Sequence, residues 1–236
     1  MKKLRLISIS VMILSITSCG ILQQSIDPKD EKTKTFTAKD FDRLAIGNAF
    51  HINVIEAGSF KIEAAGDRRD IDDLLVEERN GKLKIYFRNN FRIRRYRMNI
   101  NIEMPALKEV DFSGATVSSI KGFDNTTDMK IVLSGASEST FLTSPKTYDV
   151  DLSGASTLDL EGKSQKIYAE LSGASTLNAF STETVEASLN LSGASNSKVT
   201  VAQQLKITAS GASKVRYRGD AKVDSNLSGS SKVVKE

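Results

Sequence analysis

Two acidic side chains occupy equivalent positions in a repeated stretch of the sequence. Asp151 and Glu170 each lie two residues before a Ser-Gly-Ala-Ser tetrapeptide. If the repeats stack as neighbouring strands, the two carboxylates lie about 5 Å apart, the spacing of the acid pair in retaining glycosidases. Asp149 could add an oxygen ligand for a cation, although hard cations usually take about six or more oxygens. Solvated surface acids are the simpler interpretation, because no cleft-forming insertion interrupts these repeats.

The serines of the repeat are candidates for a nucleophile only by residue type. Ser134, Ser153, Ser172 and Ser192 each open a tetrapeptide, and the sequence places no base beside them. A serine nucleophile needs an adjacent general base, and equivalent serines in every repeat cannot all be nucleophiles. We therefore expect a structural ladder of hydroxyl groups.

The sequence offers few side chains that could bind a transition metal. His51 is the only histidine, and we expect it on the outward face of a strand between Phe50 and Ile52. A transition-metal site usually needs several histidine or cysteine ligands. The sequence therefore indicates no metal site and no cofactor.

A basic segment near the middle of the chain is the first candidate for a binding surface. Guanidinium groups beside aromatic rings suit an anionic glycan, a lipid headgroup or a nucleic acid. The alternative is a solvated loop or an edge strand that its charge protects. The segment contains Arg88, Arg92, Arg94, Arg95 and Arg97 around Phe91 and Tyr96.

Cys19 is the only cysteine, and it follows a segment typical of export. Lys2, Lys3 and Arg5 precede the apolar run 6–14, which is shorter than the roughly 20 residues of a spanning helix. The four residues ending at Cys19 resemble the lipobox of bacterial lipoproteins. That resemblance implies cleavage before Cys19 and acylation of its sulfur and its new amino group, which would anchor the chain in a bilayer. An ordinary cleaved signal with a chance cysteine is the alternative.

The charge of the mature chain gives no argument for nucleic acid. The whole chain carries a formal charge of +4, and residues 1–18 hold three basic residues and no acid, which leaves 4 − 3 = +1. A nearly neutral protein has no overall attraction for polyanions or for an anionic membrane. Residues 19–35 are mostly polar after the cysteine, and we expect them to form a flexible tether.

The repeat itself predicts the architecture that would position these residues. Apolar residues stand one and three places before each tetrapeptide except the last, and the residue between them is mostly polar, as in Val150-Asp151-Leu152. This alternation is typical of a half-buried strand. Repeats of 18 to 21 residues fit the coils of a parallel β-helix, with a glycine at each corner. The corner glycines are Gly114, Gly135, Gly154, Gly173, Gly193, Gly211 and Gly229.

The region before the repeats alternates less regularly. We expect residues 36–107 to form irregular coils that begin and cap the stack, and residues 108–234 to form the regular coils of the same single domain. Asn80-Gly81 indicates a hairpin, and the polar stretch 67–75 could form one short helix.

The layout of lipobox, tether, alternating region and Ser-Gly-Ala-Ser coils resembles the family called putative auto-transporter adhesin, head GIN domain. The resemblance covers about residues 36–234 and implies an all-β, right-handed parallel β-helix in a protein of the Gram-negative envelope. Together with the lipobox, it leads us to expect an outer-membrane lipoprotein that faces either the periplasm or the cell surface. It carries no catalytic residues. A literal Gly-Ile-Asn is absent, and Gly47-Asn48 and His51-Ile52-Asn53 are the nearest fragments.

These observations predict a membrane-anchored envelope module for binding, adhesion or structural support, and not an enzyme. The alternative is a carbohydrate-active enzyme, a lyase or glycosidase on a β-helix scaffold. The expected partners are the bilayer through Cys19, a glycan or an envelope protein, and no nucleic acid. A second copy could also associate through a terminal coil, whose free edge Lys232 and Lys235 would blunt.

Overall fold

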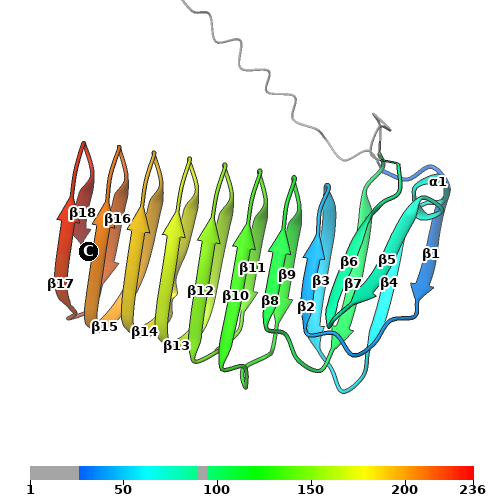
Figure 1. The fold of residues 1–236 in the computed structure, drawn as a ribbon, viewed down its shortest axis with the longest axis horizontal. Helices are drawn as coiled ribbons and strands as arrows, with labels where there is room; N and C mark the ends of the chain where they lie inside the picture. The colour runs from blue at the N-terminus through cyan, green and yellow to red at the C-terminus, as the bar shows by residue number, and fades with distance from the viewer. Residues whose placement is uncertain (1–26, 90–94) are drawn as a thin grey trace, which may run out of the picture.

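The computed structural model describes residues 27–89 and 95–236. They form an elongated stack of coils, with the N-terminal strands at one end and the C-terminal strands at the other (Figure 1). The stack is a right-handed parallel β-helix, so the predicted fold class is confirmed. Within these two ranges, no helix has the length and apolar character needed to cross a membrane.

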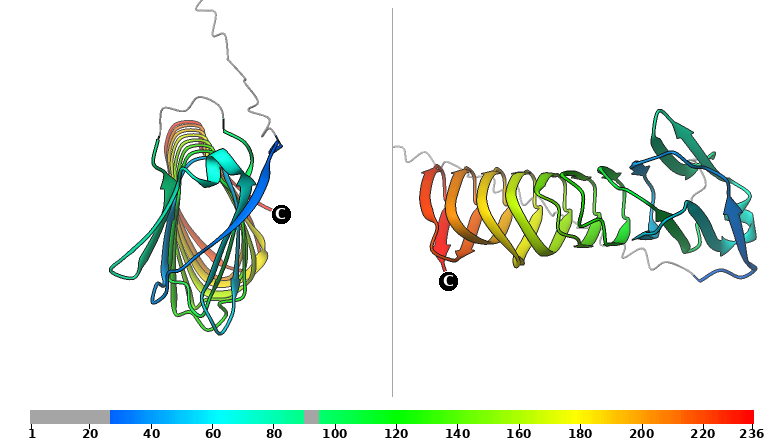
Figure 2. Two further views of the ribbon diagram at one scale, coloured as in Figure 1. Left: turned by 90° about the vertical axis from the view of Figure 1, so that its right-hand side faces the viewer. Right: turned by 90° about the horizontal axis from the view of Figure 1, so that it is seen from below.

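Each regular coil consists of a strand that enters the Ser-Gly-Ala-Ser corner and a strand that leaves it. We call the two layers built from these strands the incoming sheet and the outgoing sheet. Seen along the stack, they meet at the narrow corner and diverge towards a wide bend (Figure 2). The incoming strands are β2 (Arg43–Ile46), β6 (Lys82–Phe87), β8 (Glu109–Phe112), β10 (Asp128–Leu133), β12 (Thr147–Leu152) and β17 (Lys222–Leu227).

The outgoing strands complete the coils on the other side of the corner. They are β3 (Phe50–Glu56), β7 (Met98–Met104), β9 (Val117–Lys121), β11 (Glu138–Leu142), β16 (Lys214–Arg218) and β18 (Lys232–Lys235). Three longer strands leave one corner, follow the wide bend and enter the next corner, so they belong to both sheets. These are β13 (Thr157–Leu171), β14 (Thr176–Leu191) and β15 (Asn196–Ala209).

The corner glycines lie in one line along the stack. Their φ angles of +69° to +83° belong to the left-handed region that glycine adopts without strain. From Gly135 onward, a Cβ atom would approach the carbonyl oxygen of the preceding corner glycine to 2.4–2.6 Å. The next N–H donates to that same carbonyl, as from Ala155 to Gly135 at 2.7 Å. Glycine is therefore required both by the backbone conformation and by the spacing of the coils.

A buried ladder of hydroxyl groups accompanies the ladder of first serines that we expected. The first serines, such as Ser172 and Ser192, lie on the exposed outside of the corner. The fourth residue of each tetrapeptide points inward instead, because the left-handed glycine reverses the chain between them. These inward serines are 0–1% exposed, and most donate to the carbonyl of the first serine, as Ser195 does to Ser192 at 2.7 Å; they are Ser137, Ser156, Ser175, Ser195 and Ser213.

The core consists of the inward apolar columns that the alternation predicted. Val150 and Leu152 are 1% and 0% exposed, and the same positions in neighbouring coils are also apolar and buried. No single coil encloses these side chains. Each coil shields the apolar side of its neighbour, which is the stabilising principle of a solenoid.

The N-terminal end contains antiparallel strands, and of these the sequence pattern indicated only the hairpin at Asn80-Gly81. The coil formed by β2 and β3 lies between the β8–β9 coil and the β6–β7 coil, so spatial order departs from chain order. Antiparallel strands then close this end: β4 (Lys61–Asp67) pairs with β7 and with β1 (Glu31–Phe36), and β5 (Leu74–Arg79) pairs with β6. The tether that we expected over residues 19–35 is therefore shorter, since residues 31–35 belong to β1.

Two local expectations in this region are confirmed. A short helix, α1 (Arg68–Ile71), lies within the stretch 67–75, and Asn80-Gly81 turns β5 into β6 with positive φ at both residues. Asp67 begins the helix by accepting the N–H of Arg69 at 3.2 Å. Burial opposes ionisation of Asp67, but the N–H groups of Asp30, Lys29 and Arg69 outweigh it and lower the pKa of this carboxyl.

Candidate binding surface

The outward side chains of the outgoing sheet form two polar rows along the stack. Each coil contributes one residue to each row, so neighbours lie about 4.8 Å apart. The first row is Asn99, His51, Val117, Glu138, Thr157, Thr176, Asn196, Lys214 and Lys232. The second row is Asn101, Asn53, Ser119, Thr140, Asp159, Asn178, Lys198, Arg216 and Val234. We call this surface the outgoing face.

Amide and hydroxyl groups dominate the N-terminal and central parts of the outgoing face. An open depression of about 630 Å³ lies on this part of the face. Its lining includes His51, Asn53, Asn99, Asn101 and Thr140. His51 lies between the buried Phe50 and Ile52, so its predicted outward position is confirmed. Further along, Asn178 donates to Asp159 at 2.8 Å across neighbouring coils. The face thus offers closely spaced donors and acceptors on a rigid backbone.

The arginine segment links β6 to β7, and the structure gives Arg95 a structural role. Its guanidinium forms an ion pair with the fully buried Asp70 at 3.0 Å and a second one with Asp73. It also lies over the ring of Phe87, 3.8 Å from the centroid. The Arg95 side chain is only 14% exposed. Both its charge and its donors are therefore engaged within the protein.

The other described residues of the segment have separate surroundings. Arg97 pairs with Asp27, and the ring of Tyr96 lies against the guanidinium of Arg69 at 5.0 Å. Arg88 is exposed at the end of β6. Arg92 and Arg94, with Phe91, lie outside the described residues. The anion-binding role of this segment stays a prediction, and among its described members Arg88 is the one whose exposed position best suits it.

Asp151 and Glu170 are register partners, as the repeat predicted. Both lie exposed on the outer surface of the incoming sheet, where Asp149 is exposed as well. Solvent on this open surface keeps such carboxylates hydrated, which suits the interpretation as surface acids. Within residues 27–89 and 95–236, no three histidine, cysteine or acidic side chains gather closely enough to hold a metal ion.

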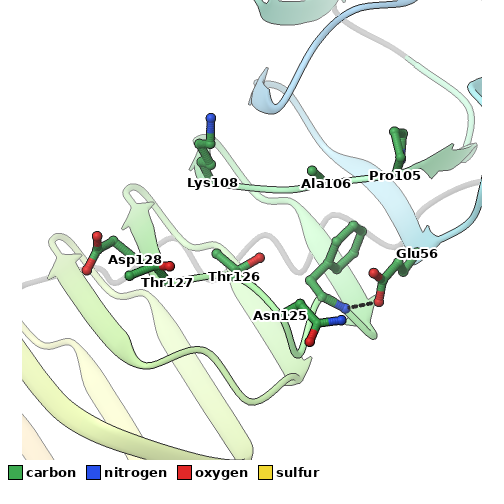
Figure 3. Close-up of a pocket in the computed structure, with 9 residues that line it drawn as sticks. Glu56, Pro105, Ala106, Lys108, Asn125, Thr126, Thr127 and Asp128 are labelled. Atoms are coloured by element: carbon green, nitrogen blue, oxygen red, sulfur yellow. Dashed lines mark hydrogen bonds between the residues drawn. The ribbon is translucent and has the colours of Figure 1, made fainter.

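A pocket at the wide bend was missed by the sequence analysis. It has a volume of about 320 Å³, and its lining includes Glu56, Pro105, Phe123, Asn125 and Asp128 (Figure 3). The 21-residue step from Gly114 to Gly135 is the longest between corners, and its additional residues form the loop before β10. The longer step was the available signal for this pocket.

Two charged groups of this pocket, Glu56 and Lys108, form hydrogen bonds that stabilise the fold. The N–H of Phe123 donates to the Glu56 carboxylate at 2.6 Å, which holds Phe123 at a φ of +63°. Lys108 donates to Asp42 at 2.6 Å. Burial opposes ionisation of Asp42, but Lys108 and Arg43 outweigh it and lower the pKa of this carboxyl. We therefore assign the binding role to the outgoing face rather than to this pocket.

The fold and the outgoing face define a class of protein, a parallel β-solenoid with a flat polar surface and rigid coils. Residues 40–221 match the family model described as putative auto-transporter adhesin, head GIN domain. The chain belongs to this family. No curated protein matches the chain.

Solved structures with the same fold include proteins from Bacteroides and Parabacteroides species. A putative adhesin from Bacteroides fragilis has a TM-score of 0.76 and 17% identity, with 89% of this chain and 98% of that chain covered. A putative lipid binding protein from Parabacteroides distasonis has a TM-score of 0.68 and 17% identity, with 89% and 99% covered. A putative adhesin from Parabacteroides merdae has a TM-score of 0.66 and 18% identity, with 89% and 98% covered. At these identities the similarity establishes the fold alone.

Proposed function

We propose that this protein is an outer-membrane lipoprotein whose solenoid is a binding module of the cell envelope. The observation that carries the proposal is the outgoing face, which presents two rows of polar side chains at a repeat of about 4.8 Å. Membership of the adhesin family supports a binding or adhesion role. The ligand class that best suits a long flat face of amides and hydroxyls is a glycan or an envelope protein.

Rigidity is what makes this face suited to binding. Every outward side chain stands on a strand that is hydrogen-bonded to neighbouring coils, such as β14 between β13 and β15. A surface that is already ordered loses little conformational entropy when a ligand binds, so more of the contact energy remains as affinity. An extended ligand could contact several coils at once, and many weak contacts would then add up.

The anchor is the first part of the proposal to test. We expect the full-length chain to incorporate an alkyne-labelled fatty acid and to sediment with membranes when it is expressed in a Gram-negative host. The Cys19→Ser variant should incorporate no label and should appear in the soluble envelope fraction. Label in the Cys19→Ser variant, or no label in the wild type, would contradict acylation at this residue.

The binding face is tested by two substitutions on one strand. Asn178 and Asn190 both belong to β14, but Asn178 is on the outgoing face and Asn190 on the incoming sheet. Full-length protein in neutral detergent is immobilised and exposed to labelled envelope extract. Asn178→Tyr, which covers the face with a large ring, should reduce the captured material at least tenfold, whereas Asn190→Tyr should leave capture unchanged. If both variants captured the same amount of material, the outgoing face would not be the binding surface.

A further inference from the structure

Five cationic side chains gather at the C-terminal end of the outgoing face. Lys214 and Lys232 are register partners in the first row, and Lys198 and Arg216 are partners in the second. Arg218 follows Arg216 on β16 and lies over the ring of Phe180 at 4.1 Å. With about 4.8 Å between strands and roughly 6.6 Å between alternate residues, these charges form a flat lattice.

This arrangement of like charges is unfavourable for the free protein. Like charges directly opposite on neighbouring strands destabilise a sheet. The incoming sheet holds partners of both kinds, since Lys166 faces Glu186 across neighbouring coils at 3.0 Å whereas Asp151 faces Glu170. Among the ion pairs of the described residues, those of the five cations are Arg216 and Arg218 with Glu236, both at 3.4 Å. The positive charge is therefore largely uncompensated within the chain.

The surface between these cations is hollowed and polar. A shallow cavity of about 230 Å³ is lined by Lys198, Lys214 and Arg216 together with Thr176 and Asn196. Thr176 and Asn196 continue the first row, so ammonium and guanidinium groups lie directly beside amide and hydroxyl groups. A ligand seated here would meet charge and neutral hydrogen-bonding groups within a few ångströms.

We propose that this end of the outgoing face binds an acidic polysaccharide, whose carboxylates or sulfates lie over the five cations and whose hydroxyls bond to Thr176 and Asn196. This inference rests on the proposed binding function and names its ligand class. A flat lattice suits an extended chain with repeated negative groups, whereas a compact phosphate is better held by donors that converge on one point. Single-stranded nucleic acid needs open aromatic platforms for its bases, and the ring of Phe180 is covered by Arg218.

The test compares two pairs of lysines from the same C-terminal coils. Lys198→Gln/Lys214→Gln removes two charges from the outgoing face, and Lys206→Gln/Lys222→Gln removes two exposed charges from the incoming sheet as the matched control. Full-length protein in neutral detergent is titrated with polygalacturonate, with neutral dextran as the reference glycan. Circular dichroism and thermal unfolding verify that each variant is folded.

We expect the wild type to bind polygalacturonate but not dextran, with an affinity that falls as salt rises. The outgoing-face variant should lose about tenfold in affinity, as expected for two ion pairs, and should show a shallower salt dependence. The control should stay within about twofold. Equal losses in both variants, or no binding by the wild type at low salt, would overturn the inference.

Two further probes separate this inference from the proposed function. Binding of single-stranded DNA or of phosphatidylglycerol vesicles as tightly as polygalacturonate would overturn the assignment to a polysaccharide. If envelope material is still captured by the wild type and lost in Asn178→Tyr while polygalacturonate does not bind, the binding function stands and the acidic ligand is wrong.

Discussion

Arg95 shows how strongly tertiary pairing determines the role of a single residue. In the sequence it is one of five arginines in a short segment. In the structure its guanidinium pairs with Asp70 of α1, which lies 25 residues earlier in the chain and is fully buried. This ion pair connects the segment before β7 to the helix. Nothing local to Arg95 indicates this partner, since Asp70 precedes a hairpin that brings the two together. Sequence reasoning found the segment but could not separate structural from exposed arginines.

Replacing Arg95 should destabilise the N-terminal end. Arg95→Gln leaves Asp70 buried with fewer compensating donors, and breaking such a pair costs about 3 kcal/mol. We expect the free energy of unfolding, measured with urea, to fall by roughly that amount. Arg88→Gln, at an exposed position of the same segment, should change it by less than about 0.5 kcal/mol. A similar loss in both variants would indicate that the ion pairs of Arg95 contribute little.

Tyr148 provides a pH-dependent test at the same scale. Its side chain is fully buried, and its hydroxyl donates to the carbonyl of Thr143 at 2.7 Å. Burial raises the pKa of Tyr148 above its usual value. In the unfolded chain the phenol ionises near pH 10, while in the folded chain it stays protonated to higher pH. Above about pH 10 the phenol therefore ionises in the unfolded chain but not in the folded one, which stabilises the unfolded state. The free energy of unfolding then falls by about 1.4 kcal/mol per pH unit.

Tyr148→Phe should remove this contribution. Urea unfolding at pH 8 to 11 should show a steeper loss of stability in the wild type than in the variant, although at neutral pH the variant should be less stable by about 1 kcal/mol because the hydrogen bond is lost. Tyr168→Phe is the control, since Tyr168 is 47% exposed. Parallel pH profiles for the wild type and Tyr148→Phe would contradict the raised pKa.

At the scale of elements, the corner is the part of the coil that the sequence specifies best. The tetrapeptide marks the turn, the alternating residues before it mark the inward columns, and both agree with the structure. The inward position of the fourth residue was not predicted, because the direction of the chain through the corner depends on the left-handed glycine, which the pattern of apolar residues does not report.

A corner glycine should not tolerate a side chain. In Gly173→Ala the new Cβ would approach the carbonyl oxygen of Gly154 to 2.6 Å, at a φ of +72°. The left-handed conformation alone costs about 1–2 kcal/mol for alanine, and the steric contact adds to it. We expect thermal unfolding to show a loss of at least about 2 kcal/mol.

The adjacent residue supplies the control for this substitution. Ala174 is exposed beside Gly173, so Ala174→Ser should be nearly neutral. If Gly173→Ala were as stable as Ala174→Ser, the close stacking of the corners would be wrong.

The N-terminal elements could not be derived in the same way. Alternation has the same period in parallel and antiparallel strands, so it predicts strands without their partners. The antiparallel pairs of β4 with β1 and β7 join residues far apart in the chain. The insertion of β2 and β3 between later coils is also non-local. The pocket at the wide bend was detectable only as a step of 21 residues between corner glycines, one residue longer than the next-longest step.

At the scale of the whole molecule, the two ends of the stack differ. Antiparallel strands and α1 cover the N-terminal end, whereas β17 and β18 pair with β15 and β16 on one side. In the last coil Leu227 and Val234 are 40% and 41% exposed. Association of two copies through this coil stays a prediction.

The last coil should open before the centre of the stack. In a solenoid each coil is stabilised mainly by its neighbours, so a coil with one neighbour is less stable than one with two. Hydrogen exchange read by mass spectrometry should show faster exchange in β17 and β18 than in β14. Equal protection at low protein concentration would contradict this, whereas protection that increases with concentration would support association through the last coil.

Because the corner glycines lie in one line, the length of the solenoid can be counted in coils. Removing residues 154–172 would join Ser153 to Gly173 and restore an intact Ser-Gly-Ala-Ser tetrapeptide, with every remaining column in phase. The protein would be shorter by one increment of about 4.8 Å, and both ends would be unaltered. The regular coils thus add length in equal units, and duplication of a single unit in the gene could lengthen the solenoid without redesigning anything else.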